Sequence, residues 1–572
     1  MKQALKFVFY WILTFLILEI SFVNWLLNNP IATFGTNDDA LISNIFNGYF
    51  GTEYQFNLVF IQPLIVFVIK LFQSILVNSN IYSHFLLFTA IASYSSIFAH
   101  FFVVKSKLIK FISISIFVLF TLTFITWFSI NPTYTGASLI AVGASTFHLL
   151  NATVQKNGKL KIFLTILGSL FLILGYLIRK ESLFIFLILF IPLFIYLQTK
   201  SNFRQNVKYI TISISIFFSA LILNLVAHNH FYSSQEWKNY EQMNNARHQI
   251  QLRAPEVQLE NKLDFVNWNK DTYQLFLRMA LIDQTQMNKE KMQQILNVTH
   301  DYVGPKSLLR TTNTNFISQI VVSFQPWTWI LKLLLLSVGV IFLSLLFNRK
   351  LLFDYLIQIS ILVIPIFILL AVLSNGYQLP ERITLNLLAA SFPIVLIPLI
   401  NNQTQNLNTR KPIIFVLSAL LLFGSWQYYK RFAIETQART NFYASRISYA
   451  EQQKTFMENL SQNIVLMGSS SVFKSDWQFP YSRFKPFDQS QRIVYLGWHN
   501  LSPLWINFLE TKKIDGSNFP ESYFEESLIY VESPENFESL KRYLINSGYK
   551  FEVKELGLFG PSDYYMYKFN LI

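Results

Sequence analysis

The feature that most constrains this chain is a succession of apolar segments, each about as long as a membrane-spanning helix. Such a helix needs ~20 mainly apolar residues, and runs close to this length recur between residues 7 and 428. Charged residues make up only 14% of the chain, whereas they make up roughly 25% of a soluble domain. The pattern predicts an α-helical polytopic membrane protein with about 11 to 13 transmembrane helices.

One apolar run is weaker than the others. Residues 57–77 contain Gln62, Pro63 and Lys70, and topology leaves room for only one crossing between residues 56 and 105. This run is therefore interpreted as re-entrant or interfacial, and the exact helix count stays open. The expected spans are 7–27, 57–77, 83–104, 111–129, 134–151, 161–178, 182–198, 208–227, 327–347, 351–373, 383–400 and 412–428.

Two polar regions interrupt or follow the apolar runs. Within a transmembrane domain at 1–428, a first outer loop covers 28–56, and 228–326 is a surface-lying helical insert in which Trp237 and Trp268 suit an interfacial belt. Residues 429–572 have a soluble composition. Buried strands at 463–468, 492–497 and 527–531, a helix starting at Ser533-Pro534 and a closing hairpin over 549–570 predict a small α/β domain.

The net charge of +14 is unevenly distributed. The insert and the last 144 residues are nearly neutral, while the rest of the chain holds 20 basic and 7 acidic residues. This asymmetry is the positive-inside signature and argues against nucleic-acid binding. It predicts a cytoplasmic N-terminus on a retained first helix, with the insert and the C-terminal domain extracytoplasmic. The basic inner segments are Lys2/Lys6, Lys105/Lys107/Lys110, Lys156/Lys159/Lys161, Lys200/Arg204/Lys208, Arg349/Lys350 and Arg410/Lys411.

The few acidic residues of the membrane half gather on the predicted outer face. Ionisable groups near hydrocarbon are costly and are candidates for function. Each also has a structural alternative: a helix cap for the aspartates, a solvated turn at Arg179, or a local ion pair at Arg382. The residues expected to line one outward cavity are Asp38, Asp39, Glu53, Arg179, Lys180, Glu181, Glu381 and Arg382.

The chain lacks the residues and motifs that several kinds of functional site require. The chain has no cysteine, no P-loop and no Gly-x-Gly-x-x-Gly motif, which excludes disulfides and thiolate metal sites and argues against a nucleotide-driven pump. His84, His100 and His148 lie in apolar segments without metal-ligand spacing, and we expect them to pack between helices.

The order of elements resembles the GT-C superfamily of multi-pass glycosyltransferases. The resemblance rests on Asn37-Asp38-Asp39 after the first helix, the corner Arg179-Lys180-Glu181, the turn Pro380-Glu381-Arg382 and the segment Asn245-Ala246-Arg247. It covers most of residues 1–400 in pattern. The chain departs from it where Phe60-Ile61-Gln62-Pro63-Leu64 stands in place of the common His-Pro-Pro-Leu-Tyr-Tyr signature.

The resemblance implies a polyprenyl-phosphate-sugar donor, a glycan or lipid acceptor and a carboxylate base in the first outer loop. Asp39 or Asp38 would be that base, with a weak preference for Asp39 because Asp38 suits a helix cap. The other residues of the cavity would bind substrate, and Asp38, Asp39 and Glu53 have the oxygen ligands that Mg²⁺ or Mn²⁺ prefers. The implied enzyme is an inverting glycosyltransferase of the bacterial plasma membrane.

Two other functions stay open. An envelope polysaccharide polymerase or ligase would depend on Arg247, Arg253 or His248 of the insert more than on Asp38. A transporter or assembly scaffold would be no enzyme, although the sequence lacks the internal repeat that is common in transporters.

Overall fold

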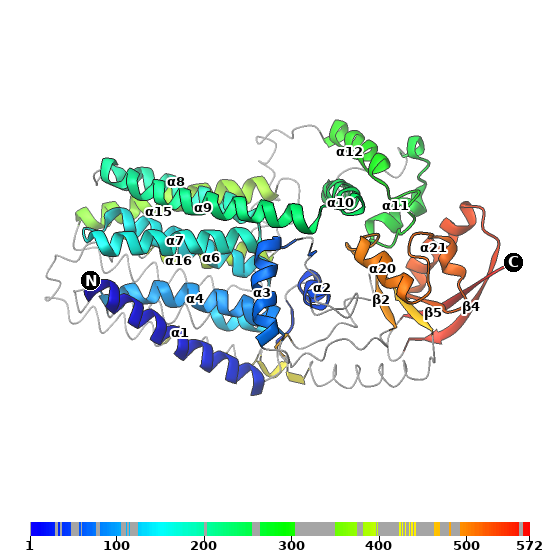
Figure 1. Ribbon diagram of the computed structural model, residues 1–572, viewed down its shortest axis with the longest axis horizontal. Coiled ribbons are helices and arrows are strands. Elements are labelled where there is room, and N and C mark those ends of the chain that lie inside the picture. The colour runs from blue at the N-terminus through cyan, green and yellow to red at the C-terminus, as the bar shows by residue number, and fades with distance from the viewer. Residues whose placement is uncertain are drawn as a thin grey trace.

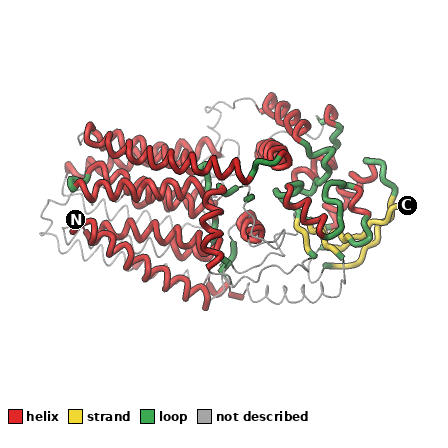
Figure 2. The backbone as a smooth tube through the Cα atoms, in the orientation of Figure 1, coloured by secondary structure: helices red, strands yellow, loops and turns green. Residues whose placement is uncertain are grey.

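The computed structural model is mainly helical, with a small sheet near the C-terminus (Figures 1 and 2). The structure describes residues 2–28, 32–34, 37–46, 57–58, 60–75, 80–103, 124–199, 203–253, 263–303, 349–374, 381–395, 463–468, 480–481, 492–559 and 564–572, with isolated positions at 110, 114, 397 and between 423 and 441.

A bundle of long helices forms one half of the molecule (Figure 1). Its centre is α6, whose residues are all buried except the last, and α6 packs against α4, α7, α8 and α16. Gly143 allows the close approach of α16, because a Cβ there would lie 2.5 Å from the carbonyl oxygen of Ala390. The bundle helices are α1 (Lys2–Asn28), α4 (Ile81–Val103), α6 (Tyr134–Val154), α7 (Gly158–Ile178), α8 (Ser182–Gln198), α9 (Phe203–Phe231), α15 (Arg349–Ser374) and α16 (Glu381–Val395).

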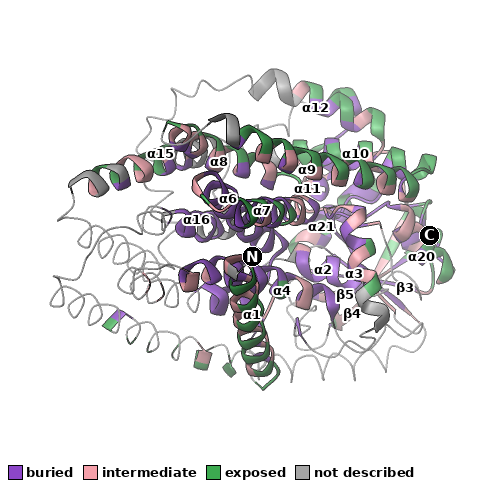
Figure 3. Ribbon diagram, turned by 60° about the vertical axis from the view of Figure 1, so that its left-hand side comes forward, coloured by how far each residue is buried: buried purple, intermediate pink, exposed green. Residues whose placement is uncertain are grey.

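Five of these helices are long and apolar enough to cross a membrane: α1, α4, α6, α7 and α9. Two of them, α1 and α9, have long exposed stretches (Figure 3). Large apolar side chains are exposed there, including Phe9, Ile20 and Phe218, as expected of helices that face lipid. The count covers only the described residues. The expected span at 327–347 and most of those at 111–129 and 412–428 lie outside them.

Basic segments of the bundle meet at one end. Asn157, between α6 and α7, donates its side-chain N–H to Gln3 Oε1 of α1. At the same end, Asn206 of α9 donates to Gln198 Oε1 at the end of α8. The N-terminus, the α6–α7 loop and the α8–α9 loop therefore share one end of the bundle, as the distribution of lysine and arginine predicts. We call it the basic end.

Two short helices lie at the opposite end: α2 (Asn37–Phe46) and α3 (Pro63–Ile75), which runs across the bundle axis (Figure 1). Just before α3, the Gln62 N–H donates to the Leu177 carbonyl at the end of α7. After α3, the Asn80 side chain hydrogen-bonds Ser43 of α2. Both flanks of α3 are thus at the same end, so residues 57–77 do not cross the bundle in this structure.

The insert folds into α10 (Gln235–Arg253), η3 (Asp264–Val266), α11 (Lys270–Leu277) and α12 (Lys289–Val303). The expected interfacial tryptophans are not at a surface. Trp268 is only 1% exposed and donates its indole N–H to Gln286 Oε1, and Trp237 is also buried. The interfacial-belt interpretation was therefore wrong for both, because they pack in the main core, Trp237 against Tyr240 and Trp268 against Phe276.

The C-terminal domain is a five-stranded sheet in the order β2-β1-β3-β5-β4. β1 pairs in parallel with β2 and β3, and β5 joins β3 to β4 by antiparallel pairing. The predicted strands, helix and closing hairpin are confirmed, and α20 is an element that the sequence did not predict. The elements are β1 (Ile464–Met467), β2 (Ile493–Tyr495), α20 (Pro503–Thr511), η6 (Glu521–Phe524), β3 (Leu528–Glu532), α21 (Pro534–Asn546), β4 (Phe551–Leu558) and β5 (Tyr565–Leu571).

Candidate functional site

The two aspartates of the first outer loop lie in the first turn of α2, and they have different surroundings. Asp39 is completely buried, whereas Asp38 is half-buried. One oxygen of Asp39, Oδ1, accepts hydrogen bonds from the Tyr82 hydroxyl (3.0 Å) and from the Tyr134 backbone N–H (2.7 Å). Tyr134 is the first residue of α6, so the carboxylate sits at the positive end of that helix dipole, where a negative charge is stabilised.

The start of α6 also holds Arg179, the C-cap residue of α7. The guanidinium Nη1 donates to the Thr135 hydroxyl, and the guanidinium carbon lies 5.3 Å from the centre of the Tyr134 ring. Its Nε lies 3.4 Å from Glu181 Oε2. A helix start, a ring face and a carboxylate thus orient this cation, which is still 26% exposed.

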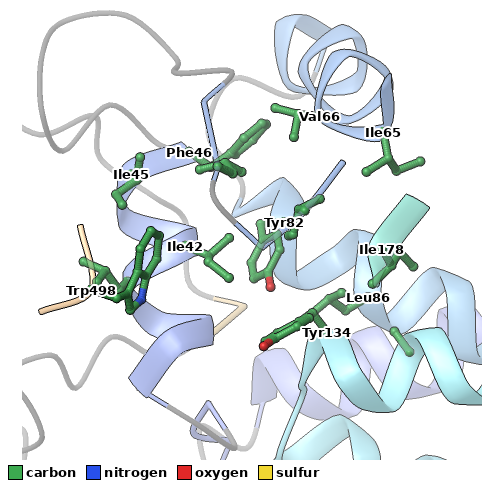
Figure 4. Close-up of a cluster of buried hydrophobic side chains, with 14 of the residues drawn as sticks. Ile42, Ile45, Phe46, Ile65, Val66, Tyr82, Leu86, Tyr134, Ile178 and Trp498 are labelled. Atoms are coloured by element: carbon green, nitrogen blue, oxygen red, sulfur yellow. The ribbon is translucent and has the colours of Figure 1, made fainter. Parts of the chain in front are cut away.

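An apolar layer supports the two tyrosines (Figure 4). Phe60 packs between the Tyr134 ring, with centroids 6.3 Å apart, and the Trp498 ring, with centroids 4.6 Å apart. Trp498 belongs to the loop after β2, so the C-terminal domain takes part in this layer. The buried side chains in the close-up come from α2, α3, α4, α6, α7 and that loop: Ile42, Ile45, Phe46, Ile65, Val66, Tyr82, Leu86, Tyr134, Ile178 and Trp498.

Helix α10 of the insert is joined to the same loop. The Trp498 carbonyl oxygen accepts from the Tyr240 hydroxyl (2.6 Å) and from Arg247 Nη2, which also donates to Asn244 Oδ1. Arg247 is only 2% exposed. Burial lowers its pKa, and Tyr240 opposes this effect. Arg247 is therefore a residue that holds two regions together.

His248, the next residue on α10, faces the charged cluster. Its side chain is exposed, yet enough protein surrounds it to lower its pKa below 6.5. The negative charges of Glu181 and Asp38 raise this pKa, while Arg247 and Arg179 lower it further. All four groups are thus close enough to act on the imidazole. Asp38, Arg179, Glu181 and His248 define the candidate site, which we call the charged cluster.

The structure brings together part of the predicted cavity. Asp38, Asp39, Arg179 and Glu181 lie at the end of the bundle opposite the basic end. Lys180 is at the same corner, but its exposed side chain makes no hydrogen bond or ion pair with another described residue. Glu53 lies outside the described residues.

The Glu381-Arg382 pair begins α16, and of these two residues the structure describes only the backbone. One turn further on, Asn386 Oδ1 lies close to Gly136, in the first turn of α6. The starts of α16 and α6 are therefore at the same end, which places the backbone of Glu381 and Arg382 on the side of the charged cluster.

Two expectations about the aspartates need correction. Asp39, which we preferred as the base, accepts the Tyr134 N–H at the start of α6, a capping role that we had expected of Asp38. A divalent metal held by Asp38 and Asp39 also fits poorly, since two donors already occupy Asp39 Oδ1. Within the described part of the chain, no three histidine or carboxylate side chains form a group that could hold a metal.

The sequence did not single out Tyr82, Tyr134 and Thr135. Each lies in the first turn of a helix at this end, α4 or α6, and Asn80 precedes α4 while Thr133 is the N-cap of α6. That position is a usable signal, because the unpaired N–H groups of a helix start attract a carboxylate. By contrast, His100 and His148 pack in the bundle as expected, hydrogen-bonded to each other.

The charged cluster lies where the helix bundle, the insert and the C-terminal domain meet. Its guanidinium, Arg179, is held in place, and its carboxylate on α2 remains partly accessible. Such a site suits an anionic group beside a reacting hydroxyl. Comparison of the chain with protein families, with curated proteins and with solved structures found no match.

Proposed function

We propose that the protein is a membrane glycosyltransferase that takes a sugar from a polyprenyl-phosphate donor and passes it to a cell-envelope glycan or lipid. The observation that carries this proposal is the charged cluster. It combines a half-buried carboxylate, Asp38, with an oriented guanidinium, Arg179, at the end of a bundle of apolar helices. A sugar on a lipid phosphate presents both an anion and a reacting carbon at the membrane surface.

The residues divide the chemistry between them. The Asp38 carboxylate takes the proton of the acceptor hydroxyl, whose oxygen then attacks the anomeric carbon of the sugar. The bond from that carbon to the phosphate oxygen breaks, and the lipid phosphate leaves with the electron pair. Arg179 neutralises this leaving group, because a guanidinium matches phosphate oxygens. A single displacement inverts the anomeric centre.

Asp39 takes a positioning role in this proposal. Its two hydrogen bonds fix α2 against α4 and α6, and so fix the direction of the neighbouring Asp38. Glu181 holds Arg179 until phosphate replaces it. Lys180, Glu53, Glu381 and Arg382 are assigned to binding of the sugar and phosphate, in keeping with their place in the chain.

The same proposal specifies the orientation of the protein in the membrane. The basic end of the bundle faces the cytoplasm and the charged cluster faces outward, in a polytopic protein of the bacterial plasma membrane. The insert and the C-terminal domain are then extracytoplasmic. The collection of basic loops at one end and acidic residues at the other supports this orientation.

A polymerase or ligase of envelope polysaccharide is the second candidate, because the charges of Glu181 and Asp38 act on the imidazole of His248. In that reaction the histidine, rather than the aspartate, takes the proton. Burial argues against a chemical role for Arg247, whose Nη2 donates to the Trp498 carbonyl and to Asn244. His248 and Asp38 are therefore the residues that distinguish the two reactions.

The experiment compares Asp38→Asn, Asp39→Asn and His248→Gln in purified full-length protein. Release of polyprenyl phosphate is measured from a panel of polyprenyl-phosphate sugars, with thermal unfolding in parallel. We expect Asp38→Asn to lose roughly 10²–10⁴-fold in rate with unchanged stability, as for a general base. We expect Asp39→Asn to lose rate and stability together.

The matched control is Asp264→Asn, the same change at an exposed position of the insert, which should leave the rate unaltered. Full activity of Asp38→Asn would exclude the proposed base. If His248→Gln alone abolished turnover, the polymerase or ligase reaction would replace the proposal.

A further inference from the structure

A second candidate binding site lies far from the charged cluster, at the basic end of the bundle. It is a cavity of about 320 Å³ between α6, α7, α8 and α9. Its walls are mostly aliphatic and aromatic, with Leu149, Phe186, Phe190 and Phe217 among them. A cavity of this kind favours an apolar occupant.

One cation lines this cavity. Lys161 of α7 is only 6% exposed. Its ammonium donates to Asn206 Oδ1 and lies 4.6 Å from the centre of the Tyr209 ring. Asn206 is itself oriented, because its amide N–H donates to Gln198 Oε1 at 2.9 Å. The lysine is therefore held in place by neighbours from α9, which are in turn supported by α8.

The partners of Lys161 do not neutralise it. Both are uncharged, and no carboxylate of the described residues lies within ion-pair distance of its ammonium. An ammonium has three N–H donors, so a hydrogen bond to Asn206 leaves donors for a further acceptor. A buried charge next to hydrocarbon is costly unless it is paired, so the phosphate of a bound ligand would stabilise this ammonium.

The cavity opens toward the side of the bundle rather than toward the charged cluster. Ile191, Ile214 and Phe218 line it and are 44%, 50% and 55% exposed, on helices whose outer surfaces are apolar. An occupant that enters across this surface comes from the bilayer. It therefore carries an apolar chain as well as the anion that Lys161 needs.

We propose that this cavity binds a lipid with an anionic phosphate headgroup, whose phosphate pairs with Lys161 and whose acyl chain lies between α8 and α9. The exposed Lys159 and Lys208 at the same end strengthen the attraction for anionic headgroups. The site is separate from the charged cluster, so it stands whether or not the protein transfers sugars.

The test uses the full-length protein in nanodiscs of phosphatidylcholine, to which phosphatidylglycerol is added in steps. Native mass spectrometry counts the retained lipid, and thermal unfolding reports its effect on stability. We expect one phosphatidylglycerol to be retained and to raise the unfolding temperature. Lys161→Gln should weaken this retention roughly tenfold or more, the loss expected for a charge-assisted hydrogen bond.

Two further variants make the result decisive. Lys159→Gln removes an exposed charge at the same end and should change retention little. Ile214→Trp, at a half-exposed position that lines the cavity, should exclude the acyl chain without removing the lysine.

Inorganic phosphate and glycerol phosphate test whether the headgroup alone is enough, and we expect neither to stabilise the protein. Stabilisation by inorganic phosphate that Ile214→Trp leaves intact would show a free-anion site instead. Equal retention of phosphatidylglycerol by the wild type, Lys161→Gln and Ile214→Trp would overturn the proposal.

Discussion

At the scale of single residues, the candidate site depends on the different burial and hydrogen bonding of two neighbouring carboxylates. Asp38 and Asp39 are adjacent in sequence, but only Asp39 is completely buried against Tyr82 and Tyr134. The sequence identified the pair through charge asymmetry. It could not tell the two apart, because the partners of Asp39 lie 43 and 95 residues away in the chain. Hydrogen bonding to such distant donors follows from tertiary packing and not from local pattern.

A prediction at this scale concerns His499, in the loop after β2. It is 2% exposed, and burial lowers its pKa to about 3, with Arg247 adding to the effect. Below pH 6.5 the unfolded chain binds a proton that the folded chain does not, so stability falls as the pH drops from 6.5 toward 3. At pH 5 the loss due to this residue is about 2 kcal/mol.

His499→Gln removes this titration. Thermal unfolding of the full chain at pH 7.5 and pH 5.0 should show a smaller decrease for the variant than for the wild type. The comparison uses the decrease in unfolding temperature between the two pH values in each protein. A change in stability that is the same at both pH values therefore does not affect it. Equal decreases in both proteins would contradict the buried, neutral state of His499.

At the scale of elements, the sequence predicted most bundle helices and all five strands, because apolar runs and buried strands have clear periodicities. It identified residues 57–77 as the weak span, and α3 proves to begin and end at one end of the bundle. The sequence did not predict that α2 packs as a helix against the bundle. The ten residues of α2 include polar groups whose hydrogen-bond partners lie in other elements. The tryptophans of the insert were misplaced for a related reason: composition does not show which surface becomes a core.

The contact between α6 and α16 gives a prediction for helix packing. A Cβ at Gly143 would lie 2.5 Å from the Ala390 carbonyl oxygen, which is backbone and cannot turn away. Gly143→Ala should therefore separate the helices and lower the free energy of unfolding by about 1–3 kcal/mol, the usual cost of overpacking.

Gly158→Ala is the matched control, because nothing lies within 4 Å of its Cβ position. That change should be neutral or slightly stabilising, since alanine favours a helix over glycine. Thermal unfolding in one detergent compares the two variants. If both changed stability equally, close contact at Gly143 would not hold α16 in place.

At the scale of the whole molecule, the C-terminal domain and the insert are joined by side chains of both regions. Arg247 and Tyr240 hold the Trp498 carbonyl, Asn500 donates to the Met279 carbonyl, and Tyr543 donates to Asp283. The loop that carries Trp498 also packs on Phe60, close to α2. The soluble half of the chain is therefore part of the candidate site and not an appended module.

The contact between the insert and the C-terminal domain can be tested by replacing one arginine at a time. Arg247→Ala takes a buried charged donor from the Trp498 carbonyl, a loss of about 2 kcal/mol or more. It should increase hydrogen exchange in α10 and in residues 497–500, and reduce the proposed sugar transfer. Arg542→Ala breaks the exposed pair with Asp271 across the same two regions, where about 0–1 kcal/mol is expected. Identical exchange in the two variants would contradict a buried anchor at Arg247.

The hydrogen bonds of Asp39 and the contacts of Trp498 also order the events of biosynthesis. When Asp39 is added to the growing chain, Tyr134, whose N–H it accepts, is still 95 positions from being made. This hydrogen bond therefore forms only after α6 has begun to be made. The Trp498 carbonyl reaches Tyr240 only after 258 further residues. A nascent chain thus lacks the contact between α10 and the loop after β2 until translation is almost complete.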